Sequence, residues 1–351
     1  MKRNSWFELL RILSSLMIVW GHAMSKGTAL VNTSGVNNFI AHIFAIGANL
    51  GSCVFIILSF SFLVKKKFEF STFIRVWVKT FYYCIILMTF CLMTHIYELD
   101  DNIISFVLPI GGRPYWFVTA YLVTFLLYPL YNVVLGKILG GEEKYFVLLL
   151  TVLFMVIPFF MKNSVLTNEL SYFFYLYSLT YVIKNKNIDF KLDVKFYFLV
   201  SLIGIILISY FTQRFYISRA IEYDYNSITR LSSNNSLMLV ICAYSLYMVF
   251  DKKIEWNSTM INYLSKASFG VYLIHCFPII KNELLWNFFG FKTYFDNPFF
   301  PVVVMLISLC IYFLAIILDI PERYLSYKII RCKAVKKICS RIDSNMMKYE
   351  I

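Results

Sequence analysis

The feature that most limits how this chain can fold is a series of long apolar stretches separated by short polar ones. A bilayer core about 30 Å thick needs roughly 20 mostly apolar residues per helix. Ten stretches approach that length, at residues 6–24, 40–64, 73–93, 115–134, 146–161, 166–183, 196–213, 231–250, 260–279 and 299–320. We therefore predict an all-α, polytopic integral membrane protein with about ten transmembrane helices, whose even number places both termini on one side of the lipid bilayer.

The composition agrees with a membrane protein and argues against other classes. Of 351 residues, 60% are hydrophobic and 15% are charged, whereas globular domains average about 45–50% apolar and 25% charged residues. This balance argues against a soluble enzyme, a disordered chain or a nucleic-acid-binding protein, although the formal charge is +13.

The distribution of basic residues predicts the orientation, because Lys and Arg concentrate in cytoplasmic loops. With the N-terminus inside, 24 of the 33 Lys and Arg residues lie in inner segments, eight in outer segments, and Arg11 within the first span. Acidic residues divide into eleven inside, eight outside and Glu8 in the first span, so the net charge is +13 inside and zero outside. We predict cytoplasmic termini, a transmembrane domain over residues 1–322 and a basic cytoplasmic tail over 323–351.

Two further patterns have simple interpretations. Residues 1–24 share with signal peptides a basic start, Lys2 and Arg3, before an apolar run, but Arg11 within the run and the missing small-residue cleavage site favour a retained span. The eight cysteines are scattered, mostly within spans, and form no CxxC pair. We interpret them as small core hydrophobes, and we predict neither a disulfide framework nor a metal site.

A polar stripe runs along the otherwise apolar first span. Arg11 and His22 are eleven residues apart, which at about 100° per residue is three turns plus roughly 20°, so both point the same way. Glu8 and Ser15 fall within about 60° of that face, and the rise from Arg11 to His22 is roughly 16 Å. Arg11 is thus expected towards the cytoplasm and His22 towards the outside.

Charged side chains inside a membrane cost about 2.5–3.5 kcal/mol on insertion scales and normally face a protein interior with a partner. Glu8, three residues before Arg11, is the expected partner. A structural interpretation remains open, in which Glu8 and Arg11 form a neutral pair and His22 hydrogen-bonds at the interface. The shared register of His22 with this pair favours a functional stripe.

Four segments resemble motifs of the acyltransferase-3 family of bacterial integral-membrane O-acyltransferases, and the resemblance covers most of the chain. Arg11 and His22 match the Arg-x10-His signature of the first helix. The other segments are residues 50–61, similar to the second helix, Pro114-Tyr-Trp-Phe, similar to the fourth, and Ser268-Phe-Gly-Val-Tyr-Leu-Ile-His275, similar to a late helix. Phe60 departs from the pattern, because the family usually has glycine there.

The resemblance implies transfer of an acyl group, usually acetyl from cytosolic acetyl-CoA, to a hydroxyl of a cell-surface or lipid-linked glycan on the outer side of the bacterial cytoplasmic membrane. No permanently bound cofactor is implied. Histidine has an unperturbed pKa near 6.5 and can accept the proton of the attacking hydroxyl, so His22 is the expected general base or, in a second route, the carrier of the acyl group. Arg11 would hold the donor or steady the helix through Glu8.

The anionic donor is expected to dock on the cytoplasmic side. Family members carry Arg-x-x-Arg near the start of the third helix, where this chain has Arg75-Val-Trp-Val-Lys79, and the i, i+4 spacing places both cations on one helical face. Arg75 and Lys79 are therefore the predicted donor-binding residues. Lys65, Lys66 and Lys67 are interpreted mainly as charges that determine topology.

The predicted acceptor residues lie near the outer side. His275 lies within a family-like motif and Trp116 either shapes the acceptor pocket or joins the aromatic belt of the membrane interface. His42 and His95 are interpreted as interfacial histidines without a catalytic role.

A transporter or flippase of a lipid-linked glycan is the main alternative, because polar stripes also line substrate paths. Transporters often show paired helices broken by Gly or Pro at the midplane, and the eight prolines show no such pairing. A polysaccharide polymerase is a third interpretation, but the longest predicted outer loop, about 214–230, is shorter than such enzymes need.

Overall fold

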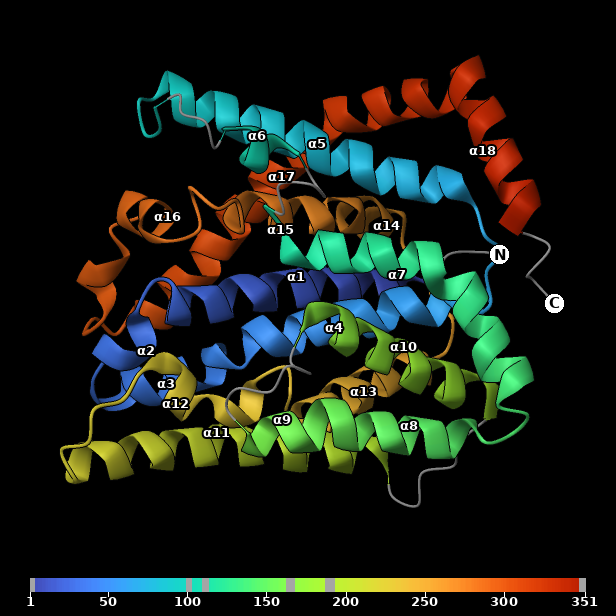
Figure 1. The fold of residues 1–351 in the computed structure, drawn as a ribbon. Coiled ribbons are helices and arrows are strands. Elements are labelled where there is room, and N and C mark those ends of the chain that lie inside the picture. The colour runs from blue at the N-terminus through green and yellow to red at the C-terminus, as the bar shows by residue number, and fades with distance from the viewer. Residues whose placement is uncertain (1–3, 99–102, 109–113, 162–167, 187–192, 347–351) are drawn as a thin grey trace. The chain divides into compact units, whose positions relative to one another are not determined.

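The computed structural model describes residues 4–98, 103–108, 114–161, 168–186 and 193–346, and every regular element in these ranges is a helix (Figure 1). This confirms the predicted all-α class. The elements are α1 Ser5–Ser25, α2 Ala29–Asn32, α3 Gly35–Ala45, α4 Gly47–Leu63, α5 Phe70–Met93, α6 Ile103–Val107, α7 Trp116–Val133, the π-helical turn η1 Val134–Ile138, α8 Glu143–Thr151, the π-helical turn η2 Val152–Val156, α9 Ile157–Phe160, α10 Glu169–Lys186, α11 Val194–Ser218, α12 Tyr225–Ile228, η3 Arg230–Ser232, α13 Leu237–Asp251, α14 Thr259–Leu264, η4 Ser265–Ala267, α15 Ser268–His275, α16 Glu283–Phe288, η5 Phe291–Tyr294, α17 Phe300–Arg331 and α18 Lys333–Met346.

Within the described ranges, seven helical segments are long and apolar enough to cross a membrane, and all seven coincide with predicted spans. They are Ser5–Ser25, Gly35–Leu63, Phe70–Met93, Trp116–Ile138, Glu143–Phe160, Val194–Ser218 and Phe300–Arg331. The other three predicted spans coincide with α10, with the shorter α13, and with α14 and α15, which η4 separates. The protein is a multi-pass membrane protein, while the count of ten spans and the cytoplasmic termini stay predictions.

The chain divides into two compact units. Two of the boundaries between them cut a helix, one within α4 and one within α17. Unit 1 comprises residues 1–58, 189–275 and 280–316, and unit 2 comprises 59–188, 276–279 and 317–351. Some charges of the topology argument lie outside the described residues: Lys2, Arg3, Arg113, Lys162, Lys191 and Lys348.

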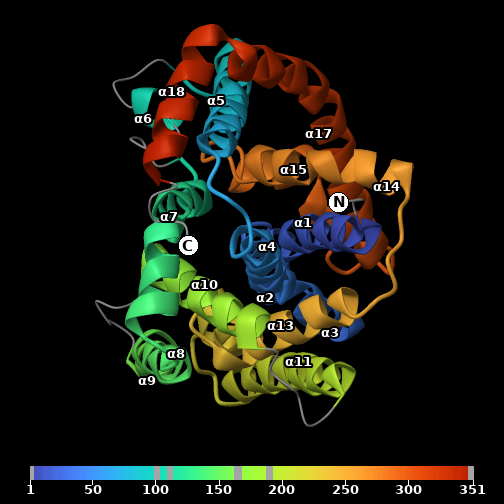
Figure 2. The ribbon, with the colours of Figure 1, turned by 90° about the vertical axis from the view of Figure 1, so that its right-hand side faces the viewer.

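In unit 1, the first helix packs against several others. Helix α1 contacts α2, α3, α13, α14 and α15. Helices α11 and α13 run side by side in both views (Figures 1 and 2). The indole N–H of Trp20 donates to Ser308 Oγ at 3.1 Å and joins α1 to α17. Within the polar stripe of α1, Glu8 and Ser15 are buried by protein, while Arg11 and His22 are partly exposed.

In unit 2, aromatic side chains form much of the interior between α7 and α10. Tyr131 Oη lies 2.7 Å from Ser178 Oγ, and Tyr177 Oη donates to Asn132 Oδ1 at 2.7 Å. The terminal helix α18 contacts α5 (Figure 2), and the carboxylate of Asp343 accepts the backbone N–H of Phe70, the first residue of α5, at 2.7 Å. Within unit 2 the tail is thus attached to the start of the third predicted span.

Candidate functional site

The candidate site is built on α1, which begins where the sequence provides a cap. The side chain of Asn4 accepts the backbone N–H of Trp6 at 3.1 Å, which satisfies one of the unpaired donors of the first turn. The hydroxyls of Ser14 and Ser15 donate to backbone carbonyls of the preceding turn, so the helix has no unpaired hydroxyl at these buried positions. The helix is uninterrupted from Glu8 to His22, as the predicted register requires.

Glu8 and Arg11 form the predicted ion pair at the start of this helix. The Glu8 side chain is 7% exposed and that of Arg11 23% exposed. Glu8 Oε2 also accepts the hydroxyl of Ser265, at 2.6 Å, from η4. A carboxylate that accepts from two donors on different elements holds α1 against the segment that leads into α15.

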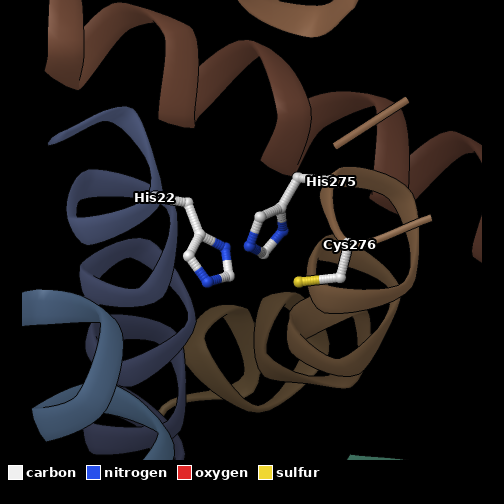
Figure 3. A group of neighbouring side chains, drawn as sticks. All are labelled: His22, His275 and Cys276. Carbon is white, nitrogen blue, oxygen red and sulfur yellow. The ribbon is translucent and has the colours of Figure 1, made fainter. Parts of the chain in front are cut away.

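His22 and His275 face each other at the other end of α1 (Figure 3). Their ring centroids are 5.1 Å apart with the planes at 50°. Both residues belong to unit 1, and His275 is 1% exposed. Cys276, also labelled in Figure 3, is the next residue in the chain and belongs to unit 2.

A hydrogen bond orients the His275 ring. Its Nδ1 lies 2.6 Å from the carbonyl oxygen of Val271, one turn earlier in α15, so Nδ1–H is the donor. In the neutral imidazole the proton then sits on Nδ1 and the lone pair on Nε2. The sequence predicted both histidines separately, at positions 22 and 275, and the structure brings their rings together.

Close backbone packing determines where His22 lies. A Cβ added to Gly21 would be 2.1 Å from the backbone nitrogen of Ala48, and one added to Gly51 would be 2.5 Å from the carbonyl oxygen of Ser14. Helices α1 and α4 therefore touch through their backbones, which small residues permit in membrane proteins. The Gly47-Ala-Asn-Leu-Gly51 spacing is the sequence signal for this contact, which was not predicted.

In unit 2, Lys79 is engaged by a partner that the sequence analysis did not identify. Its Nζ donates to Asp319 Oδ2 at 2.8 Å, and Tyr83 Oη donates to Asp319 Oδ1 at 2.6 Å. Arg323 donates to the same carboxylate at 3.3 Å, and Asp319 is fully buried. Arg75, by contrast, is exposed. The two predicted donor-binding residues therefore have different environments.

The other singled-out residues have separate surroundings. Trp116 in unit 2 is partly exposed, and its ring meets Phe173 edge-on at 6.4 Å. His42 in unit 1 is fully buried, with Nδ1 2.8 Å from Ser209 Oγ and Nε2 2.7 Å from Gln213 Oε1, which joins α3 to α11. His95 is exposed. The buried hydrogen bonds of His42 give it a packing role.

The fold and these contacts describe a multi-pass, all-α membrane protein in which a histidine of the Arg-containing helix α1 faces a second histidine on α15. The comparison with family models then identifies the family. The acyltransferase-3 model, described as an acyltransferase domain, matches residues 4–318. The chain belongs to this family and is a membrane acyltransferase. No curated protein and no solved structure gives a significant match to it.

Proposed function

We propose that the protein transfers an acyl group, acetyl from cytosolic acetyl-CoA, to a hydroxyl of a cell-surface or lipid-linked glycan on the outer side of the bacterial cytoplasmic membrane. The observation that carries this proposal is the pair of facing imidazoles, His22 and His275, on α1 and α15. Membership of an acyltransferase family supports the reaction class. The acetyl donor and the glycan acceptor follow from the resemblance described above.

In the direct route, His22 accepts the proton of the acceptor hydroxyl as its oxygen attacks the thioester carbonyl. The carbon–sulfur bond breaks, the new ester forms, and the coenzyme leaves as a thiolate that takes up a proton. A positioned general base of this kind contributes about 10²–10⁴-fold in rate. In the second route a ring nitrogen of His22 attacks the thioester carbonyl, the carbon–sulfur bond breaks, and the coenzyme leaves as a thiolate that takes up a proton. The acceptor hydroxyl then displaces the acyl group from His22, which takes the hydroxyl proton as the ester forms.

His275 has a defined part in either route. Because its Nδ1–H is held by the Val271 carbonyl, the ring is fixed in place, and the nitrogen with the lone pair is Nε2. This Nε2 accepts a hydrogen bond from the acceptor hydroxyl or from a protonated His22. The contact with the hydroxyl orients the acceptor, and the contact with protonated His22 stabilises its imidazolium form. We assign His275 to acceptor binding on the first of these contacts.

The charges at the predicted cytoplasmic side complete the proposal. The contacts of Glu8 with Arg11 and Ser265 support a positioning role for this ion pair, which keeps α1 in register with η4. Arg75, exposed on α5, is proposed to contact the anionic donor. Lys79, paired with Asp319, is proposed to support that helix face, and Trp116 to contribute an aromatic surface to the acceptor.

The test uses membranes that contain the protein and acetyl-CoA labelled in the acetyl group. Label is expected on a surface glycan, and His22→Ala is expected to abolish it at unchanged protein level. His95→Asn is the matched control, because His95 is an exposed histidine with φ +54° and asparagine tolerates this left-handed conformation.

Two outcomes would contradict the proposal in different ways. Labelling that survives His22→Ala would remove the catalytic assignment of His22. Deletion of the gene that leaves glycan acylation unchanged, but traps a lipid-linked sugar inside the cell, would favour a flippase instead.

A further inference from the structure

A cavity in unit 2 combines volume with a single sign of charge. It measures about 590 Å³ and is lined by Lys65, Lys66, Lys67 and Lys137, together with uncharged residues. Ligand pockets are typically about 300–1,000 Å³. No acidic side chain lines the cavity among the described residues. We refer to it as the lysine cavity.

The lysines differ in how far they are already neutralised. Lys66 Nζ pairs with Glu69 Oε2 at 2.8 Å. Within the described part of the chain, Lys65, Lys67 and Lys137 form no ion pair and are exposed. Three like charges at one cavity repel one another, and a bound polyanion relieves this repulsion.

The wall of the cavity is held in place by hydrogen bonds. Tyr128, 2% exposed, donates from its hydroxyl to the backbone carbonyl of Lys66 at 3.2 Å. This bond ties the segment of Lys65, Lys66 and Lys67, here called the lysine loop, to α7. Four residues later on the same face, Asn132 Oδ1 accepts the hydroxyl of Tyr177. With its carbonyl occupied, the Asn132 amide offers a ligand its NH2 group, which is a hydrogen-bond donor.

A π-helical turn, η1, completes the wall beyond α7. Gly136 lies within this turn and lines the cavity, and a Cβ there would be 2.7 Å from the hydroxyl of Tyr181, which also lines it. Because Gly136 has no side chain, the space next to the Tyr181 hydroxyl stays open as part of the cavity.

We infer that the lysine cavity binds the phosphates of the acyl-CoA donor. This inference rests on the proposed function and assigns a docking site to its donor. The cavity lies on the loop and helix end that the positive-inside pattern predicts to be cytoplasmic, where the coenzyme is available. Its lining is cationic and donor-rich, which fits phosphate oxygens. The phosphate of an anionic lipid headgroup has the same chemistry, so the test separates the two sources.

The experiment compares donors with and without phosphates. The triple variant Lys65→Gln, Lys67→Gln, Lys137→Gln is expected to raise KM for acetyl-CoA at least about tenfold. It is expected to leave KM for acetyl-pantetheine, which has no phosphate, within twofold of the wild type. The matched control replaces the exposed Lys333, Lys336 and Lys337 of α18 by Gln, which removes equal charge and no cavity lining.

Direct binding separates this inference from the proposed function. Titration calorimetry of CoA with the purified wild type should show binding that weakens with salt, and the triple variant should bind at least tenfold more weakly. If the wild type transfers acetyl and the triple variant keeps the wild-type KM and CoA affinity, the assignment of the lysine cavity to donor binding is overturned and the proposed function is not. A wild type that neither binds CoA nor transfers would overturn the proposed function, and with it this donor.

Two further arms cover lipid binding and folding. Wild type and triple variant are compared in nanodiscs of phosphatidylcholine with or without phosphatidylglycerol. If the triple variant loses stimulation by the anionic lipid but keeps its CoA affinity, the cavity binds a lipid headgroup and the inference is overturned. If the triple variant does not accumulate, single variants provide the measurement. Lys137→Glu should raise KM for acetyl-CoA more than Lys137→Gln, and equal values at the wild-type level would overturn the inference.

Discussion

The contact between α1 and α4 beside His22 leads to a quantitative prediction for Gly21→Ala. The new Cβ would lie 2.1 Å from the backbone nitrogen of Ala48, whereas ordinary contacts begin at about 3.4 Å. The helices must therefore separate by about 1.3 Å, the difference of these values. Neither atom belongs to a flexible side-chain end, so rotation cannot relieve the clash.

The cost of this separation can be estimated. Overpacking costs typically 1–3 kcal/mol, and a clash between backbones belongs at the upper end, about 3 kcal/mol. Alanine recovers about 1 kcal/mol of helix propensity relative to glycine. We expect a net loss of about 2 kcal/mol. A displacement of about 1 Å at a catalytic group can cost 10²-fold, so acyl transfer should fall about a hundredfold.

The assay measures acetyl transfer and thermal unfolding of the detergent-solubilised protein. The matched control is Gly204→Ala in α11, whose Cβ would be 2.4 Å from the terminal methyl carbon of Met238, a flexible end that can move away. This control should keep wild-type activity and stability. If Gly21→Ala keeps activity within twofold and the wild-type unfolding temperature, the close approach of the two helices does not position His22.

Three other substitutions test the remaining contacts. Glu8→Gln removes the charge partner of Arg11 and should lower the free energy of unfolding by about 1–2 kcal/mol; a double-mutant cycle with Arg11→Met that shows no coupling would exclude the pair. Asp319→Asn leaves the Lys79 ammonium without its carboxylate, with an expected loss of about 3 kcal/mol, and unchanged thermal stability would contradict this. His275→Gln should raise KM for the acceptor and leave KM for acetyl-CoA unchanged; the reverse pattern would move His275 out of the acceptor site.

Much of the fold could be predicted because hydrophobic length is a local property. A span is recognised from about 20 consecutive residues, and seven predicted spans coincide with long apolar helices. The region predicted as span 260–279 is broken into α14, η4 and α15. A run of apolar residues gives no sign of such breaks in a helix. Contacts between distant residues, such as that of Ser265 with Glu8, are not visible in it.

The site could be predicted in part. The Glu8–Arg11 pair followed from i, i+3 spacing, and the structure shows it. Lys79 was predicted to bind the donor, and its partner Asp319, 240 residues further along the chain, was not foreseen. Nothing in the local sequence around Lys79 indicates which distant carboxylate will meet it. Lys65, Lys66 and Lys67 were interpreted mainly as charges that determine topology. The cavity beside them could not be predicted, because it forms only when residues of α7 and α10 pack next to this loop.

The sequence by itself determined the solvent and the stripe. Continuous apolar stretches of about 20 residues indicate helices that cross a lipid bilayer, and the helical repeat places Arg11 and His22 on one face. The tertiary structure alone decided that His22 meets His275, which lies 253 residues later. Helix association in lipid depends on close packing and on hydrogen bonds between helices. Those are properties of paired surfaces, such as Gly21 against Ala48, and no single stretch of sequence contains them.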